Sequence, residues 1–205
     1  MRKTLVAFVA SVFVLSPLNL SATAFPVEKV AQSVVPIYSP EMGEDVCSAV
    51  ALTGAGVFVT AGHCVLSELE LQIFGKDTEP MQVDEDNDLA VIRTKERVKT
   101  IPIVIGPEPK MGDEVMTFGF AGARQQITFF PGIVQTRNDP QQWGHMIVAG
   151  HSGAGQSGGA VVDIKGRLVA VHQGWADPTN QNQRGLLTVV SNYPALRALI
   201  DKFIR

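Results

Sequence analysis

The sequence predicts an all-β protein, either a sandwich of sheets or a pair of barrels, and three observations support this expectation. Many short runs rich in β-branched and aromatic residues follow one another along the chain. Nineteen glycines and twelve prolines are spread over 205 residues, which suits many turns better than a few long helices. Hydrophobic residues make up 45% of the chain and charged residues 18%, a composition too apolar for a disordered protein.

The N-terminus is typical of a secretory signal peptide. Arg2 and Lys3 provide a positive start, and residues 5–15 form a short, almost wholly apolar run. Ala22-Thr23-Ala24 then matches the small-residue signal for cleavage. Because the apolar run is too short to span a bilayer, we expect cleavage after Ala24 and a secreted or periplasmic protein of residues 25–205. An uncleaved N-terminal anchor is the alternative interpretation.

The charge pattern argues against several classes of partner. The net charge is −3 and no basic cluster is present, whereas affinity for nucleic acid depends on neutralising phosphates. No acidic or basic run marks an interaction tail. A globular chain of this size buries enough surface to form its core without a cofactor or metal, so neither is expected.

The predicted strands begin with a hairpin, in which the runs 47–53 and 57–60 flank a glycine-rich turn. Later runs of the same kind cover residues 69–74, 89–93, 101–105, 114–118, 127–130, 133–136, 146–149, 160–164, 168–172 and 186–190. Two prolines within 106–109 interrupt the pattern. They predict a boundary between a first unit, about 34–106, and a second unit, about 112–190.

The C-terminus differs from the rest because its apolar residues have helical spacing. The residues expected on one helix face are Leu196, Leu199, Ile200, Phe203 and Ile204. Asn192 can cap a helix of about residues 193–204, and Pro194 suits its first turn. We expect this helix to pack on the second unit.

The two cysteines, Cys47 and Cys64, lie at the ends of the predicted hairpin. An even pair in an exported protein predicts a disulfide, and the hairpin would bring its two ends together. Two free, buried thiols are the alternative.

Two segments carry residues suited to acyl transfer. In residues 155–159, three glycines surround a serine and allow the backbone N–H groups of Gly155 and Ser157 to form one oxyanion hole. A serine hydroxyl is a poor nucleophile until an adjacent base takes its proton. The candidate base is His63, which follows a β-run and is anchored by Cys64.

A carboxylate must hold such a base in the right tautomer. Asp88 is favoured because it directly precedes the apolar run 89–92, whose burial would shelter it. Asp84 and Asp86 remain alternatives, since a one-residue slip of a strand changes which side chain enters the core.

Together these segments resemble the motifs of the chymotrypsin-fold (trypsin-like) serine proteases. Residues 60–64, 88–92 and 155–159 are similar to the family's three motifs, in the family's order His, Asp, Ser. The cysteine pair resembles the family's disulfide beside the catalytic histidine. The resemblance implies two six-stranded antiparallel barrels with the active site between them and a C-terminal helix. It also implies a serine endopeptidase that hydrolyses polypeptides through an acyl-enzyme, with a catalytic triad of His63, Asp88 and Ser157.

One departure from the digestive trypsins concerns activation. Those enzymes carry an aspartate just before the nucleophile, which pairs with a new N-terminus after activation cleavage. This sequence has Gln156 there, which cannot form that ion pair. Trypsin-style activation is therefore not expected.

The resemblance also places a specificity pocket, which is similar to that of the bacterial glutamyl endopeptidases. His151 stands where trypsins carry an aspartate, so a preference for Lys or Arg loses its counter-charge. His172 lies where glutamyl endopeptidases carry a histidine, Ser152 adds a hydroxyl, and Gly174 belongs to the same wall. These groups suit a carboxylate or an amide, which predicts cleavage after Glu, or after Gln or Asp. The alternative is a pocket for small apolar residues, with His172 a buried strand histidine.

Other functions fit the sequence less well. The Gly-x-Ser-x-Gly pattern also occurs in α/β-hydrolases, but their fold alternates strands and helices. A non-catalytic homologue that acts as a binding module remains an alternative, as does a purely structural role for Ser157 and His63. His145 and His151 have a spacing that fits no metal-ligand motif, so no metal site is expected.

Overall fold

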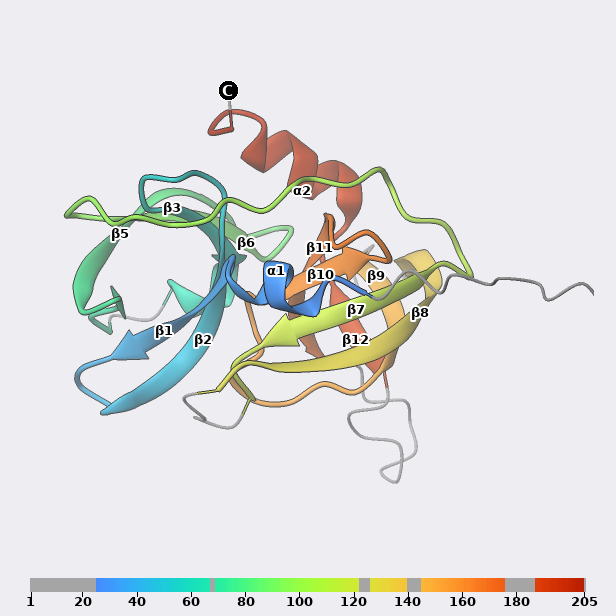
Figure 1. Ribbon diagram of the computed structural model, residues 1–205, viewed down its shortest axis with the longest axis horizontal. Helices are drawn as coiled ribbons and strands as arrows, with labels where there is room; N and C mark the ends of the chain where they lie inside the picture. The colour runs from blue at the N-terminus through green and yellow to red at the C-terminus, as the bar shows by residue number, and fades with distance from the viewer. Residues whose placement is uncertain (1–24, 67–68, 122–125, 140–144, 176–186, 205) are drawn as a thin grey trace, which may run out of the picture.

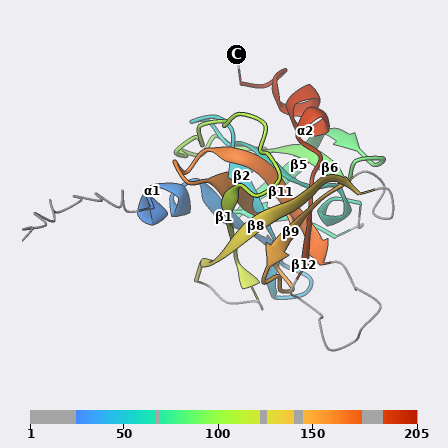
Figure 2. The same ribbon diagram turned by 90° about the vertical axis from the view of Figure 1, so that its right-hand side faces the viewer.

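The strands form two closed antiparallel barrels, which lie side by side with the C-terminal helix above them (Figures 1 and 2). The structure is a computed structural model and describes residues 25–66, 69–121, 126–139, 145–175 and 187–204. It confirms the expected all-β fold of two six-stranded barrels and a C-terminal helix. The expected signal peptide, residues 1–24, lies outside the described residues.

The first barrel has the strand order β1-β2-β3-β6-β5-β4. Its strands are β1 (Val34–Ser39), β2 (Glu44–Ala51), β3 (Val57–Ala61), β4 (Gln72–Ile73), β5 (Lys76–Asp84) and β6 (Leu89–Thr94). The expected hairpin is β2–β3, in which Val50 pairs with Val59. Alternating apolar side chains fill the barrel, with Ile37, Phe58 and Ile92 almost wholly buried.

The second barrel has the strand order β10-β11-β12-β9-β8-β7. Its strands are β7 (Glu114–Gly119), β8 (Thr128–Asp139), β9 (His145–Gly150), β10 (Ala160–Asp163), β11 (Leu168–Trp175) and β12 (Leu187–Val190). Val134, Met146 and Val161 belong to its interior. All its strand pairs are antiparallel, which excludes the α/β-hydrolase alternative, because that fold is built on a largely parallel sheet.

Several strand expectations differ from the structure, and only Gln72–Ile73 of the expected run 69–74 forms a strand, β4. Residues 101–105 do not form a strand: Pro102 lacks an N–H to donate, and only Ile105 makes a single bridge, to Leu168. The runs 127–130 and 133–136 belong to one continuous strand, β8. Strands β1 and β5 were not predicted. The half-exposed residues of β5 carry little apolar pattern, and its Pro80 lies at an irregularity in the pairing with β6.

A shared hydrophobic core joins the two barrels. Side chains from both barrels, among them Val59, Leu89, Phe118 and Leu168, belong to one buried cluster with residues of the C-terminal helix. Burial of each such side chain contributes about 1.5–3 kcal/mol. The barrels are therefore held in one fixed arrangement, which allows residues from each to form a common site.

The two helices lie against this arrangement. Helix α1 (Val27–Ala31) contacts β1, and helix α2 (Tyr193–Ile200) contacts both β6 and β11. The C-terminal helix packs on the second barrel as expected, and it also contacts the first barrel, because its apolar face covers the junction of the two. The side chain of Asn192 caps α2 by accepting a hydrogen bond from the Ala195 N–H. No helix among the described residues has the length and apolar character needed to cross a membrane.

Candidate active site

The first barrel brings His63 and Asp88 together. His63 lies in a short 3-10 helix (Gly62–Cys64) directly after β3, and Asp88 directly precedes β6. Since Ala61 of β3 pairs with Leu89 of β6, the residues just beyond these strand ends are neighbours. The His63 Nδ1 lies 2.8 Å from the Asp88 Oδ2, and the His63 backbone N–H donates to Oδ1 at 2.7 Å. Because a carboxylate only accepts, Nδ1 carries the proton and Nε2 is left as a base.

Asp88 is less sheltered than its apolar strand suggested. Its side chain is 27% exposed, and its backbone has a positive φ of 48°, a conformation that aspartate tolerates better than most residues. Asp84 instead binds the side chain and backbone N–H of Asn87 and so supports the turn before β6. Asp86 is exposed. Among the described contacts, neither Asp84 nor Asp86 binds His63.

The second barrel provides Ser157, in the loop between β9 and β10. Two glycines allow this loop to pass through a tight space. A Cβ on Gly158, whose φ is +83°, would lie 2.0 Å from the backbone oxygen of Ser48, and one on Gly159 would lie 2.1 Å from that of Phe118. The Ser157 hydroxyl donates to the Gln173 carbonyl at 3.4 Å. No hydrogen bond joins Ser157 to His63 among the described contacts.

The nucleophile loop, between β9 and β10, has two backbone N–H groups without a hydrogen-bond partner among the described residues. The N–H groups of Gly155 and Ser157 make no hydrogen bond to any residue that the structure describes. Gln156 is completely buried between them: its Oε1 accepts from the Gly153 N–H at 2.9 Å, and its Nε2 donates to the Thr128 Oγ1 at 3.2 Å. Both ends of this amide are thus satisfied inside the protein.

His63 lines two hollows at the junction of the barrels. One has a volume of about 510 Å³ and is also lined by Ala154 and Gly155. The other, of about 520 Å³, is lined by Asp88, Gln173, Gly174 and Trp175 together with His145. An extended polypeptide could therefore pass His63 with chain on either side of it.

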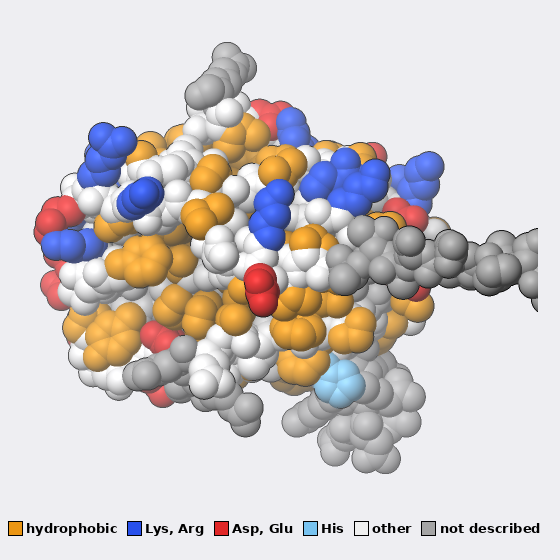
Figure 3. All heavy atoms as spheres, viewed as in Figure 1, with side chains coloured by type: hydrophobic (Ala, Val, Ile, Leu, Met, Phe, Trp, Pro, Cys, Tyr) orange, Lys and Arg blue, Asp and Glu red, His pale blue; other side chains and the backbone are white. Residues whose placement is uncertain are grey.

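A third hollow, of about 410 Å³, lies elsewhere, between Phe25 and the outer surface of β7 and β8. Its lining is mainly apolar, and hydrophobic side chains are scattered over the face of the molecule shown in Figure 3. His63, Asp88 and Ser157 are not among the residues that line it, so this hollow is separate from the candidate active site.

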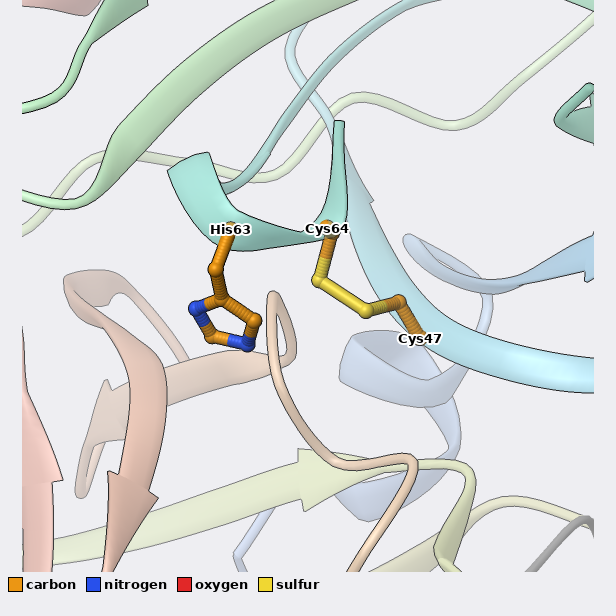
Figure 4. A group of neighbouring side chains, drawn as sticks. All are labelled: Cys47, His63 and Cys64. Atoms are coloured by element: carbon orange, nitrogen blue, oxygen red, sulfur yellow. A yellow bond between two sulfur atoms is a disulfide. The ribbon is translucent and has the colours of Figure 1, made fainter. Parts of the chain in front are cut away.

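Cys47 and Cys64 form a disulfide beside His63, as Figure 4 shows. It ties β2 to the helical turn that carries the histidine. The potential ligand atoms of these three side chains lie within 4.8 Å of one another. Metals bind cysteine as the thiolate, and the disulfide removes both thiolates from use.

Three of the residues expected in a specificity pocket are in contact. The Ser152 Oγ lies 2.7 Å from the His172 Nε2 and donates to the Gly174 carbonyl at 3.2 Å. Burial lowers the pKa of His172 to about 3, and the nearby His63 acts in the same direction, so the imidazole is neutral. His151, expected in the same pocket, is exposed and stacks on Phe130 at 5.7 Å between ring centroids. No described contact joins its ring to the Ser152–His172 pair.

His145 is a second buried histidine near the site. Burial lowers its pKa, while the negative charge of Asp88 and the side chain of Gln173 act in the opposite direction. It lines the same hollow as Asp88, and His151 is not among the residues that line that hollow.

Comparison with known proteins identifies the family. Residues 47–171 match the family model of the trypsin-like peptidase domain, and this range contains His63, Asp88 and Ser157. The chain belongs to this family. The trypsin-like peptidase fold is similar to that of a serine-to-alanine mutant of Rv3671c from M. tuberculosis H37Rv in its inactive form. The TM-score is 0.69 at 17% identity, with 87% of this chain and 90% of that chain covered, a likeness of fold alone. No curated protein sequence gives a significant match.

Membership of the trypsin-like peptidase family makes this chain a peptidase, whose substrates are polypeptides. Two further residues lie at the site that the sequence motifs did not indicate. Gln173 is a buried polar residue of β11, next to His172, and Ser48 is a polar residue within the buried end of β2. A buried polar residue in an apolar run needs a specific partner, and that was the signal available in the sequence.

Proposed function

We propose that the protein is a serine endopeptidase in which Ser157 attacks the peptide carbonyl and His63 takes its proton. Asp88 holds the histidine and stabilises its charged form, and the N–H groups of Gly155 and Ser157 stabilise the oxyanion. The observation that carries the proposal is the double contact of Asp88 with the ring and backbone of His63, which leaves Nε2 as the base.

The reaction requires the Ser157 hydroxyl to exchange its 3.4 Å contact with Gln173 for one with His63. Such contacts are often long before substrate binds. Attack then forms a bond from Oγ to the carbonyl carbon, and His63 returns the proton to the leaving amine. A water molecule activated by the same histidine hydrolyses the acyl-enzyme. We further propose that the protein is exported, since residues 1–24 have the pattern of a signal peptide and its two cysteines form a disulfide.

Labelling with a fluorophosphonate tests the proposal on the exported protein. We expect one covalent adduct on Ser157, and no adduct in Ser157→Ala or His63→Ala when circular dichroism shows that both variants are folded. Folded wild-type protein that takes up no label would contradict the proposal and favour a non-catalytic binding module instead. Labelling that persists in His63→Ala would exclude His63 as the base.

The proposed specificity is cleavage after Glu or Gln, and it is supported by the Ser152–His172 pair. A neutral imidazole and a hydroxyl can donate or accept, so they suit the amide of Gln as well as the carboxyl of Glu. A bound carboxylate favours the charged imidazole, and the pKa of His172 then rises, which takes up a proton. Preference for Glu over Gln should therefore increase as pH falls.

A peptide library, followed by matched Glu and Gln peptides compared from pH 5 to pH 8, provides the test. We expect cleavage mainly after Glu or Gln and a Glu/Gln ratio of kcat/KM that rises in acid. His172→Ala should lose this preference. Cleavage mainly after Lys, Arg or large apolar residues would overturn the specificity but leave the serine endopeptidase proposal standing, and so would an unchanged preference in His172→Ala.

A further inference from the structure

Ser48 of the first barrel holds the nucleophile loop of the second barrel at two points. Its backbone N–H donates to the Ser157 carbonyl at 2.7 Å, and its hydroxyl donates to the Gly155 carbonyl at 2.8 Å. The Phe120 N–H donates to the same hydroxyl at 2.9 Å, and the Thr60 hydroxyl donates to the Ser48 carbonyl at 2.8 Å. Ser48 is completely buried, and each of its polar groups has a partner.

These contacts fix the direction of the Ser48 hydroxyl proton. A hydroxyl has one proton and two lone pairs. Since the Phe120 N–H occupies a lone pair, the proton is left for the Gly155 carbonyl, which can only accept. The bond therefore has one orientation.

Hydrogen bonds fix the orientation of two of the three peptide planes that lead to Ser157. The plane between Gly155 and Gln156 is held by Ser48 at its oxygen and by the Gly153 carbonyl at its N–H. The next plane, which carries the Ser157 N–H, is held because the Gly159 N–H donates to its oxygen at 2.8 Å. The plane that carries the Gly155 N–H has no such bond among the described residues.

The orientation of the Gly155 N–H thus depends on the next plane along the chain. Gly155 has a φ of +86°, a left-handed conformation that glycine can leave at little cost. If the contact of the Gly155 carbonyl with Ser48 is lost, rotation about Gly155 can turn its N–H away from the hole.

We propose that Ser48 is a positioning residue, whose hydroxyl holds the Gly155 N–H in the orientation needed for the oxyanion hole. The proposal rests on the serine endopeptidase function given above. It assigns Ser48 a role in turnover rather than in substrate binding, because the oxyanion forms only in the transition state. Loss of a whole oxyanion donor lowers kcat by about 100- to 1,000-fold, so loss of its anchor should lower kcat by about 10- to 30-fold.

The test compares Ser48→Ala with wild type and with a matched control, Ser191→Ala. Ser191 is also completely buried, and its hydroxyl accepts the Val171 N–H at 2.9 Å, but it binds no part of residues 153–159. Using a peptide that wild type cleaves, we expect Ser48→Ala to lower kcat about 10-fold or more with KM within twofold. The rate of fluorophosphonate labelling should fall in parallel, and the pH midpoint of kcat/KM should not move. Ser48→Thr, which keeps the hydroxyl, should recover most of the loss.

Each outcome decides the inference. The inference would be overturned if Ser48→Ala and Ser191→Ala had the same kcat, or if the loss in Ser48→Ala were confined to KM. A shifted pH midpoint in Ser48→Ala would also overturn it, because the effect would then act through His63. If Ser48→Ala fails to fold, Ser48→Gly removes the same hydroxyl, and the same comparison applies. Wild-type protein that neither cleaves peptide nor takes label would instead refute the proposed function itself.

Discussion

The Gln173 side chain donates to the backbone carbonyl of Asp88 at 2.7 Å, across the junction of the two barrels. The same amide donates to the Asn87 carbonyl at 2.6 Å, while the Gln173 backbone carbonyl accepts the Ser157 hydroxyl. One residue of β11 therefore contacts both the loop that presents the carboxylate and the serine. The position of Asp88 depends on the second barrel as well as on its own.

Replacement of Gln173 tests this contact. Gln173→Glu keeps the shape of the side chain but turns a donor into an acceptor that faces two carbonyls. We expect Gln173→Ala to lower kcat about 10-fold, which corresponds to about 1.4 kcal/mol, the scale of one or two hydrogen bonds. Gln173→Glu should lower it further because of repulsion. Steady-state kinetics on a cleaved peptide provides the measurement, and a Glu variant as active as wild type would contradict the assigned role.

Substitution of the carboxylate distinguishes the three aspartates near His63. Asp88→Asn should lower kcat by roughly 10⁴-fold, because the amide can hold the histidine in the wrong tautomer. Asp84→Asn and Asp86→Asn are matched controls, and each should retain kcat within a few fold. The folding of each variant is checked by thermal unfolding. Near-normal turnover by Asp88→Asn would move the assignment to Asp86, the exposed neighbour.

The disulfide between Cys47 and Cys64 should be present in exported protein and should stabilise it. It closes a loop with a sequence separation of 17, for which the chain-entropy model gives about 3 kcal/mol. Urea unfolding with and without reductant should show a loss of this size in wild type and none in Cys47→Ala/Cys64→Ala. Mass spectrometry after alkylation without reductant gives a direct check. Two alkylated thiols on native, exported protein would exclude the bridge.

Acid should destabilise the protein through His172. Its pKa is about 3 in the folded protein and near 6.5 when unfolded, so between these values the unfolded chain binds the extra proton. The contribution of neutral His172 to the free energy of unfolding is therefore fully present above about pH 6.5, and it decreases as the pH is lowered. From pH 7 to pH 5 the loss is about 2 kcal/mol for this group.

His172→Gln provides the comparison, since its amide can still contact Ser152 but does not titrate. Urea unfolding at both pH values should show a smaller loss in this variant than in wild type by about 2 kcal/mol. His145, whose pKa is also lowered by burial, contributes in the same direction to both proteins and cancels in the difference. An equal acid dependence of the two proteins would show that His172 is not the group responsible.

The sequence allowed prediction of the fold where apolar residues alternate and turns are marked by glycine. It failed at β5, where Pro80 and exposed polar residues hide a strand that is held by its neighbours in a closed barrel. It also failed at residues 101–105, which are apolar enough for a strand but contain Pro102. Strand β5 pairs with β4 and β6, the strands next to it along the chain, so what was missing there was an apolar pattern and not a distant partner. At residues 101–105 an apolar pattern is present, but Pro102 has no N–H to donate to a neighbouring strand.

The candidate site divides in the same way. The sequence predicted that His63, which follows one β-run, and Asp88, which precedes another, lie together. The structure places them in contact. The roles of Ser48 and Gln173 could not be predicted, because each depends on hydrogen bonds to the opposite barrel. Ser48 is separated from Gly155 by 107 positions in the sequence, and Gln173 is separated from Asp88 by 85. The pocket expectation for His151 depended on the direction of an exposed loop side chain, which sequence spacing does not determine.

The histidine and the serine belong to separately closed barrels, and this division has a consequence for the newly made chain. An intermediate in which only one barrel has folded contains a base without a nucleophile, or a nucleophile without a base. Under the proposed function, such a chain has no complete triad and does not hydrolyse itself or its neighbours. Proteolytic activity would appear abruptly, when the two barrels dock, and its onset could be used to time that docking step in a refolding experiment.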